Sequence, residues 1–408
     1  MIRKHYIVNK IYKDREQNKM HGTLIGMNQR NMNDKNKGVL LKSIVTQGPM
    51  SRVKLSKLLG LSKMTITGIV NEYLAKGILQ ECGSASSTGG RKPMFLDVVP
   101  NSLLSLGVSI GRDVIQVGII NLKGEVIQSE NLPFAPIVDG DAFLGSIFYL
   151  CDELLKHKLR SNIWGIGVSC AGPLSIQNGI ILNPPDFNDI RDIHITKELH
   201  ERYSLPTYLH NDMCTAALAE MYFGNTENYN SFAYIGISAG IGAGIIIDKK
   251  IYSGTMGLAG AIGHSTVERN GYPCECGQRG CLEKYSSTKA VLEWAKNNGA
   301  EDDITWFELV RRANKGDSIC QKAIERMIDY LGVAINNMQM ALDIECIFIG
   351  GDLYFFRDTV VNHIKDKLQS QSLAWSQRRR VKVEASSFMG NASFIGIAAM
   401  VMENNLTV

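Results

Sequence analysis

Residues 258–287 read LAGAIGHSTVERNGYPCECGQRGCLEKYSS, and four side chains that commonly bind metals occur within them: His264, Cys274, Cys276 and Cys281. One imidazole and three thiolates fill all four positions of a tetrahedral Zn²⁺ site, so no position is left to activate water. The glycines between them let the backbone fold tightly around an ion. We therefore expect a structural zinc ion. The alternative is a loop of free thiols beside a core histidine.

On both sides of this stretch, strand-like and helix-like segments alternate, as they do in α/β folds. Strand-like apolar segments lie at 104–110, 115–120, 124–127, 163–168, 207–209, 232–237, 243–248 and 346–349, and helix-like segments at 141–157, 287–298 and 319–342. No repeat of solenoid length is present. Residues 99–408 are therefore expected to form an α/β body.

The first quarter of the chain differs from this body in charge. Residues 1–100 contain 17 Lys and Arg against 6 Asp and Glu, whereas residues 101–408 contain 27 against 34. A basic segment attached to an acidic body is typical of a nucleic-acid-binding module. The alternative is a solvated basic surface without a partner.

Apolar residues at helical spacing predict three short helices between residues 36 and 77, followed by a β-hairpin that ends at residue 98. Gly48 ends the first helix, and Ser51 and Ser62 cap the second and third. This order predicts a winged helix-turn-helix over residues 36–98, preceded by a flexible basic arm over 1–35. The residues expected at DNA are Ser62, Lys63, Met64, Thr65 and Thr67 on the third helix and Arg91 and Lys92 on the wing.

The composition is that of a globular protein, with 408 residues of which 45% are hydrophobic and 21% charged. The best candidate for a membrane span, residues 232–247, is too short and holds four glycines. The first 30 residues have no apolar core of a secretory signal. Nine cysteines are an odd number, which favours metal ligation over a disulfide framework. We expect a cytoplasmic protein with no membrane partner.

The stretch at 258–287 resembles the signature of the ROK family of repressors and sugar kinases, A-G-E-x-G-H followed by C-x-C-G-x-x-G-C-L-E. Further matching motifs occur in the family's order at 165–173, 210–220, 236–244 and 349–351. The N-terminal helices and Gly-Gly-Arg-Lys-Pro at 89–93 resemble the family's repressor branch. The resemblance covers residues 36–408. It implies a winged helix-turn-helix followed by a two-lobed, actin-like fold, with lobe I at 99–213 plus 393–408 and lobe II, which holds the zinc loop, at 214–392.

The resemblance also implies a sugar site in the cleft between the lobes. Asn211 and Asp212 match the family's sugar-binding pair, whose Asp takes the proton from the sugar hydroxyl in the kinases. His264 matches a histidine that binds zinc through one ring nitrogen and presents the other to the sugar; the zinc loop is therefore expected to transmit the sugar signal. Glu283 matches a second sugar carboxylate, and Asp186 stands where the family usually has Asn. Taken alone, Glu283 or Asp186 is more simply a surface carboxylate.

Two departures from the family's pattern bear on activity. The kinases have Asp-x-Gly-Gly-Thr after the first strand, where this chain has Ser-Ile-Gly-Arg-Asp at 109–113, and an aspartate there repels ATP phosphates. The later glycine loop at 240–244 is retained, although glycines also serve tight strand turns. Ala261 replaces the Glu of A-G-E-x-G-H, so one acceptor for a sugar hydroxyl is missing.

We therefore predict a sugar-responsive transcriptional regulator without enzymatic activity, a repressor of carbohydrate-utilisation genes that a sugar ligand releases. Its expected partners are operator DNA, a carbohydrate effector and further copies of the chain, in a homodimer or a dimer of dimers, because paired recognition helices match palindromic half-sites. Two alternatives remain. One is a ROK-type sugar kinase with an appended DNA-binding domain, and the other is a repressor controlled by a protein partner.

Overall fold

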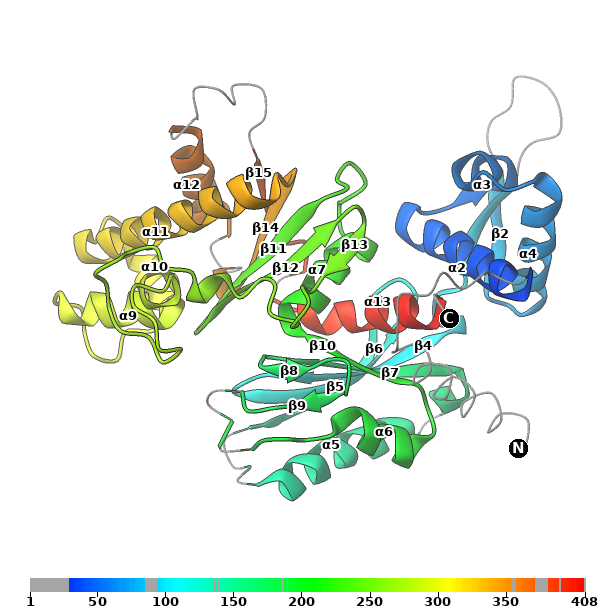
Figure 1. Ribbon diagram of the computed structural model, residues 1–408, viewed down its shortest axis with the longest axis horizontal. Helices are drawn as coiled ribbons and strands as arrows, with labels where there is room; N and C mark the ends of the chain where they lie inside the picture. The colour runs from blue at the N-terminus through cyan, green and yellow to red at the C-terminus, as the bar shows by residue number, and fades with distance from the viewer. Residues whose placement is uncertain are drawn as a thin grey trace.

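The computed structural model describes residues 29–84, 94–134, 137, 139–156, 158–184, 187–188, 190–353, 357–370, 381–388 and 390–406. Three of the predicted site residues, Arg91, Lys92 and Asp186, lie outside the described residues. The described chain forms an N-terminal module and two larger lobes that meet at a pair of central helices (Figure 1). None of its helices combines the length and the apolar character needed to cross a bilayer.

The N-terminal module contains the three expected helices and the expected hairpin. They are α2 (Gln29–Gln47), α3 (Arg52–Leu59), α4 (Lys63–Ala75), β2 (Leu79–Ser84) and β3 (Met94–Val98), with the short strand β1 (Met50–Ser51) paired to β3. The Ser51 and Ser62 hydroxyls accept hydrogen bonds from the third backbone N–H of α3 and α4, as N-caps do. Helix α2 begins at Gln29, earlier than the boundary expected at residue 36, so residues 29–35 are helical where an arm was expected.

Lobe I is built on a five-stranded sheet with the order β10-β7-β4-β5-β6. Its strands are β4 (Leu104–Ile110), β5 (Val114–Asn121), β6 (Val126–Pro133), β7 (Ile163–Cys170) and β10 (Thr207–Asn211). Its other elements are η1 (Pro100–Ser102), η2 (Lys158–Asn162), β8 (Leu174–Ser175), β9 (Ile180–Ile181), α5 (Gly140–Leu155) and α6 (Ile195–Tyr203). The outer face of the sheet is covered by α5 and α6 (Figure 1).

Lobe II repeats this topology, with the strand order β13-β12-β11-β14-β15. In both sheets three antiparallel strands are followed by two parallel ones. The strands are β11 (Phe232–Ile237), β12 (Ile241–Ile247), β13 (Lys250–Tyr252), β14 (Cys346–Gly351) and β15 (Lys382–Ala385). The remaining elements are η3 (Ile262–His264), α8 (Glu283–Ser286), α9 (Thr288–Asn297), α10 (Trp306–Asn314), α11 (Ser318–Leu342) and α12 (Arg357–Ser370). This internal repeat fits the expected two-lobed, actin-like architecture.

Two helices lie between the sheets, α7 (Asp212–Phe223) and α13 (Ala392–Leu406). A Cβ at Gly396 would collide with the backbone oxygen of Thr215, so this glycine lets the two helix backbones approach closely. The boundary predicted between residues 213 and 214 falls within the first turn of α7, so a helix joins the lobes there.

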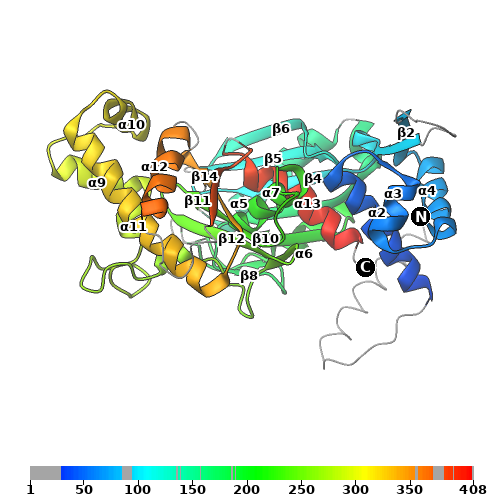
Figure 2. The same ribbon diagram turned by 90° about the horizontal axis from the view of Figure 1, so that it is seen from above.

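The N-terminal module packs on the same two helices, and the buried residues of α2, α7 and α13 belong to one hydrophobic cluster. Lys42 of α2 pairs with Glu403 of α13, and its Nζ lies 4.9 Å from the ring centroid of Tyr222 in α7. Figure 2 shows this module at one end of the molecule and α9 to α11 at the other.

Candidate functional site

The four predicted metal ligands come together in the structure. One ligand atom from each of His264, Cys274, Cys276 and Cys281 lies within 4.8 Å of the others. The Cys274 Sγ is 3.6 Å from His264 Nδ1, and the Cys276 Sγ is 3.6 Å from the Cys281 Sγ. These separations are close to the edges of a tetrahedral site with Zn–S bonds of about 2.3 Å and a Zn–N bond of about 2.0–2.1 Å, which are about 3.8 Å between two sulfurs and about 3.5 Å between sulfur and nitrogen. The donor set therefore fits a closed metal site, and the Nε2 atom of His264 is left for another partner.

Glycines shape the metal loop, residues 264–281, and Glu283, a residue predicted to bind the sugar, follows it directly. Gly277 and Gly280 have φ values of 88° and 70°, in the left-handed region that other residues avoid. Glu283 follows Cys281 by two residues and begins α8. The Glu283 Oε2 accepts a hydrogen bond from the backbone N–H of Ile241, at 3.1 Å. The loop and this carboxylate are thus fixed together against the start of β12.

Arg112 of lobe I approaches the same place in lobe II. It lies in the turn between β4 and β5 of lobe I, and its Nη2 is 3.5 Å from the Cβ position of Gly240 in lobe II. The Glu283 Oε2 is 2.9 Å from that same position. A Cβ at Gly240 would press on the end of the Glu283 side chain, which would have to shift, and would come into ordinary contact with the Arg112 guanidinium.

Asn211 and Asp212 lie at the start of α7, between the lobes. Asn211 is the N-cap, and its side chain accepts a hydrogen bond from the backbone N–H of Met213, at 3.0 Å. Burial raises the pKa of Asp212 above its usual range, and the nearby Arg112 guanidinium partly offsets this rise. Arg112 is therefore close to two predicted sugar carboxylates, Asp212 and Glu283, a role that its place in the sequence did not indicate.

Two of the three glycines in the loop at 240–244 allow close packing and do not form an open phosphate-binding loop. A Cβ at Gly242 would lie 2.8 Å from Cγ of Met213, and one at Gly244 would collide with the Met213 backbone oxygen. These glycines bring β12 against α7, whereas a Cβ at Gly240 would face the side chains of Glu283 and Arg112. The alternative that these glycines serve the geometry of the strands is confirmed for Gly242 and Gly244.

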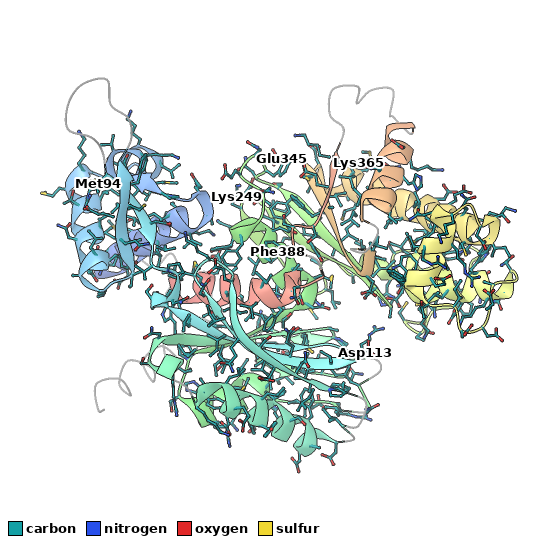
Figure 3. All side chains as sticks on the ribbon, turned by 180° about the vertical axis from the view of Figure 1, so that it is seen from behind. Met94, Asp113, Lys249, Glu345, Lys365 and Phe388 are labelled. Carbon is teal, nitrogen blue, oxygen red and sulfur yellow. The ribbon has the colours of Figure 1, made fainter. Side chains whose placement is uncertain are left out.

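Two further carboxylates, one from each lobe, interact electrostatically. Asp113, next to Arg112, lies at the end of lobe I farthest from the N-terminal module, in which Met94 is labelled (Figure 3). The pKa of Asp352, which follows β14 of lobe II, is raised by desolvation and by the negative charge of Asp113. Negative charge from both lobes at this place disfavours the polyphosphate of a nucleotide.

His210 supports the Asn-Asp pair from the buried side. The backbone N–H of Asn211 donates to its Nδ1 at 2.9 Å, so the proton is on Nε2, 3.3 Å from the Ser253 hydroxyl. Burial lowers the pKa of His210 to about 4. The imidazole is thus neutral near pH 7. Its position before Asn211 is the only sequence feature that points to this role.

This pKa leads to a stability prediction. Between pH 6.5 and about 4, His210 binds a proton in the unfolded chain but not in the folded chain. The contribution of His210 to the free energy of unfolding is therefore fully present above pH 6.5 and decreases as the pH falls through this window. In His210→Asn the Asn oxygen can accept the same N–H without titrating. We expect the wild-type free energy of unfolding to fall more steeply than the variant's, by up to about 1.4 kcal/mol per pH unit. Urea unfolding at several pH values measures this, and parallel pH profiles would contradict it.

The predicted DNA-contact residues that the structure describes lie at the start of α4. Met64 is 84% exposed, and Lys63 and Thr67 are also exposed. Ser62 and Thr65 share a 2.9 Å hydrogen bond between their hydroxyls, and Ser62 accepts from the Thr65 N–H, so these two residues hold the helix start. The exposed set is therefore Ser62, Lys63, Met64 and Thr67, of which Ser62 also caps the helix, while Thr65 is half-buried.

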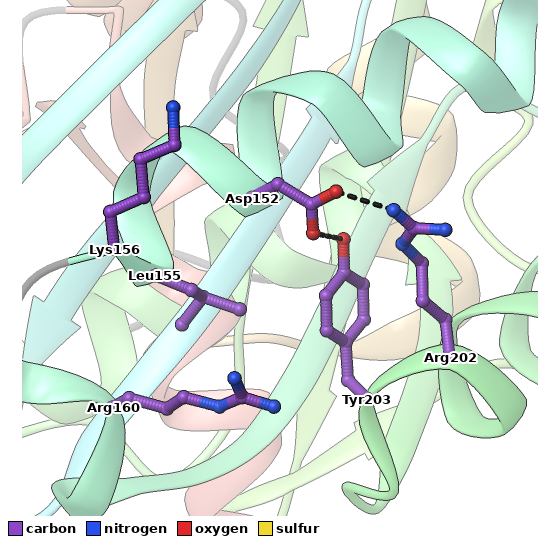
Figure 4. A pocket seen from close by; sticks show the side chains of 6 residues that line it. All are labelled: Asp152, Leu155, Lys156, Arg160, Arg202 and Tyr203. Atoms are coloured by element: carbon purple, nitrogen blue, oxygen red, sulfur yellow. Dashed lines mark hydrogen bonds and ion pairs between the residues drawn. The ribbon is translucent and has the colours of Figure 1, made fainter.

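A cavity of about 500 Å³ on the outer side of lobe I is separate from this site (Figure 4). It is lined by Asp152, Leu155, Lys156, Arg160, Arg202 and Tyr203. Asp152 accepts hydrogen bonds from Arg202 at 2.5 Å and from the Tyr203 hydroxyl at 2.8 Å. The walls come from α5, η2 and α6, on the face of the sheet opposite α13, and none of the predicted site residues lines it.

Comparisons with known proteins place this geometry in a family context. The model of the ROK family matches residues 105–404. The xylose repressor of Caldicellulosiruptor bescii is 29% identical over 386 residues, which cover 91% of this chain and 96% of that protein. The Escherichia coli K12 regulator NagC, described as a DNA-binding transcriptional dual regulator, is 27% identical over 377 residues, which cover 90% of this chain and 92% of that protein.

Solved structures share the fold. A ROK family transcriptional regulator, a homologue of the E. coli MLC protein, superposes with a TM-score of 0.77 at 23% identity and covers 92% of this chain and 98% of its own. A ROK family glucokinase from Streptomyces griseus, in complex with glucose and AMPPNP, has a TM-score of 0.65 at 22% identity and covers 73% of this chain and 98% of its own. The regulators match nearly the whole chain, whereas the kinase matches about three quarters.

Proposed function

The chain belongs to the ROK family, and from this premise we propose that it is a sugar-responsive transcriptional repressor of carbohydrate-utilisation genes. The observation that carries the proposal is the match over 90% or more of the chain to regulators, N-terminal module included. The exposed start of α4 supports DNA binding by that module. We further propose that the protein acts as a dimer or a dimer of dimers, because a two-fold pair of helices matches a palindromic operator.

We propose that the His264, Cys274, Cys276 and Cys281 cluster holds a structural Zn²⁺ ion. All four donors come from the protein, so the bound ion would supply rigidity and no open position for catalysis. The sugar would bind between Asn211, Asp212, His264 and Glu283, with Asp186 as a further polar partner. Arg112 holds a positive charge beside the two carboxylates in the free protein.

The helix α7 supports a route from the sugar to DNA. It begins at Asp212, and its last turn holds Tyr222, whose ring lies beneath Lys42 of the N-terminal module. Gly38 of α2 also approaches the backbone of Leu406 in α13, with no room for a Cβ. A ligand that prefers one arrangement of the lobes would move α7 and α13 and thereby shift the module. This route would act in addition to the metal loop, which the sequence analysis expects to transmit the sugar signal.

The proposal can be tested by selecting duplexes from a random pool with the full-length protein. An enriched duplex should be bound with an affinity that falls as salt rises, since phosphate contacts release counterions. Binding is then repeated with xylose, glucose, N-acetylglucosamine and their phosphates. Enrichment of no duplex would reject the DNA-binding function, and a bound duplex that no sugar affects would favour the alternative in which a protein partner controls the repressor.

The wing prediction concerns Arg91 and Lys92. Replacement of both by alanine should weaken binding to the enriched duplex and reduce the slope of log K against log salt by about two, because each lost phosphate contact removes about 0.9 from it. Fluorescence anisotropy at several salt concentrations measures both quantities. Lys315→Ala with Lys322→Ala removes the same charge from exposed positions of lobe II and is the control. An unchanged slope and affinity in the Arg91 and Lys92 variant would reject the wing assignment.

Kinase activity is expected to be absent. Arg112 and Asp113 occupy the turn that cradles phosphate in the family's kinases, and Asp113 and Asp352 bring like charges to the cleft. We expect no phosphorylation of glucose, xylose or N-acetylglucosamine above background in a coupled ATPase assay. Robust turnover that Asp212→Asn abolishes would instead establish the sugar-kinase alternative.

A further inference from the structure

The solvent-facing side of α4 carries an unusual set of residues for an exposed helix. Ile66, Ile69, Val70 and Tyr73 are buried, and Met64, Thr67, Gly68 and Asn71 occupy the opposite face. These four positions follow the i, i+3, i+4, i+7 spacing of one helix face. Met64 is 84% exposed, and none of the four residues carries a charge.

Gly68 is not required by the fold. It lies in the middle of the helix, where glycine is among the poorest helix formers. A Cβ at this position would meet no atom within 4 Å, so alanine would fit and favour the helix. A glycine on an open helix face is explained by a partner that must approach the backbone closely.

The exposed face of α4 is apolar except for the side-chain amide of Asn71. The Thr67 hydroxyl donates to the backbone oxygen of Lys63 at 2.8 Å, so its methyl group remains for contact. The carboxylate of Glu72, the residue after Asn71, accepts hydrogen bonds from Lys37 and Lys76 at 2.9 and 2.7 Å. The face therefore consists of a thioether side chain, a methyl group, a bare backbone and the Asn71 amide.

We infer that this face reads thymine methyl groups through Met64 and Thr67 and an adenine through Asn71, with Gly68 admitting the edges of the base pairs. In the major groove the thymine C5 methyl is the apolar feature, and Asn pairs with the N6 and N7 atoms of adenine. Met64 and Asn71 are seven residues apart, or about 10 Å along the helix axis, which spans about three base-pair steps. The inference rests on the proposed DNA-binding function and specifies what its operator contains.

The test removes single methyl groups from the DNA. Each thymine of the enriched half-site is replaced by uracil, and the Kd of the full-length protein is measured for each duplex. We expect uracil to weaken wild-type binding about fourfold at one or two positions, the effect of one methyl group lost from apolar contact. Met64→Ala should bind the thymine and uracil duplexes equally at one of them. Met340→Ala, which changes an exposed methionine of lobe II, should discriminate as the wild type does.

A second measurement separates DNA contact from folding. Gly68→Ala should raise Tm and weaken binding to the enriched duplex about tenfold, as the loss of a base contact does. Gly145→Ala is the matched control, because Gly145 is an exposed glycine within α5 whose Cβ would also meet nothing within 4 Å; it should raise Tm and leave DNA binding unchanged. Asn71→Ala should relax the preference for adenine at one position.

The inference is overturned if no uracil duplex binds more weakly, if the half-site contains no thymine, or if Gly68→Ala binds as tightly as the wild type. Each of these outcomes leaves the proposed DNA-binding function intact, since a duplex is still enriched and bound. Failure to enrich any duplex rejects that function, and this inference with it.

Discussion

Cys276→Ser should release the bound metal and lower Tm by roughly 10 °C. Metal binding in such sites is coupled to folding, so the lost binding free energy is lost stability. Each kcal/mol shifts Tm by about 2–4 °C for domains of 150–250 residues. Cys276 is exposed, so the serine hydroxyl can be solvated and no buried polar group is created. Elemental analysis of protein purified without chelators and differential scanning calorimetry measure the two effects.

The control for this change is Cys82→Ser, in the β2 strand. Cys82 is a partly exposed thiol outside the cluster, and we expect this variant to keep one zinc ion per chain and the wild-type Tm. Wild-type protein that contains no zinc would remove the metal proposal. If the wild type contains zinc and Cys276→Ser loses it without a change in Tm, the ion does not stabilise lobe II.

Asp212→Ala should bind the operator as tightly as the wild type while no longer responding to the sugar. Couplings between two ligands are typically about 1–3 kcal/mol, so the sugar should weaken wild-type operator binding about 5- to 150-fold. In the variant this factor should be within about twofold of one. Asp212 begins α7 and is far from α4 in the chain, so we expect its loss to remove the proposed sugar contact without changing the exposed face of α4. Anisotropy titrations with and without the sugar give both affinities.

By reciprocity, operator DNA should weaken sugar binding to the wild type by the same factor, which calorimetric titration of the complex can measure. Asp141→Ala, which removes an exposed carboxylate from the first turn of α5, is the control and should respond fully. A full response in Asp212→Ala would exclude Asp212 from the sensor, whatever the operator affinity.

Sequence patterns predicted those parts of the molecule that depend on local order. The four metal ligands lie within a stretch of 18 residues, and their spacing led directly to the cluster that the structure contains. The start of α4 was equally clear, because Ser62 and the apolar stripe that follows form a local cap and helix signal. The family resemblance supplied the order of the two lobes, which no local pattern indicates.

Long-range contacts were not predictable in the same way. The sequence identifies Arg112 only as a departure from the kinases' phosphate-binding loop. Its approach to Gly240 and Asp212 depends on how the two lobes meet, which no local pattern indicates. The pairing of Lys42 with Glu403 joins residues at opposite ends of the chain. Gly68 could have been noticed as a break in an otherwise strong helix pattern, but the absence of a neighbour around it is visible only in three dimensions.

The docking of α2 on α13 has a consequence for the time course of synthesis. The module lies at residues 29–98, whereas the helix that completes its docking surface is Ala392–Leu406. At a translation rate of about 5–20 residues per second, these segments leave the ribosome roughly 15–60 s apart. During that interval Lys42 and Gly38 have no α13 to contact. The N-terminal module of a nascent chain therefore leaves the ribosome well before it can dock on α13.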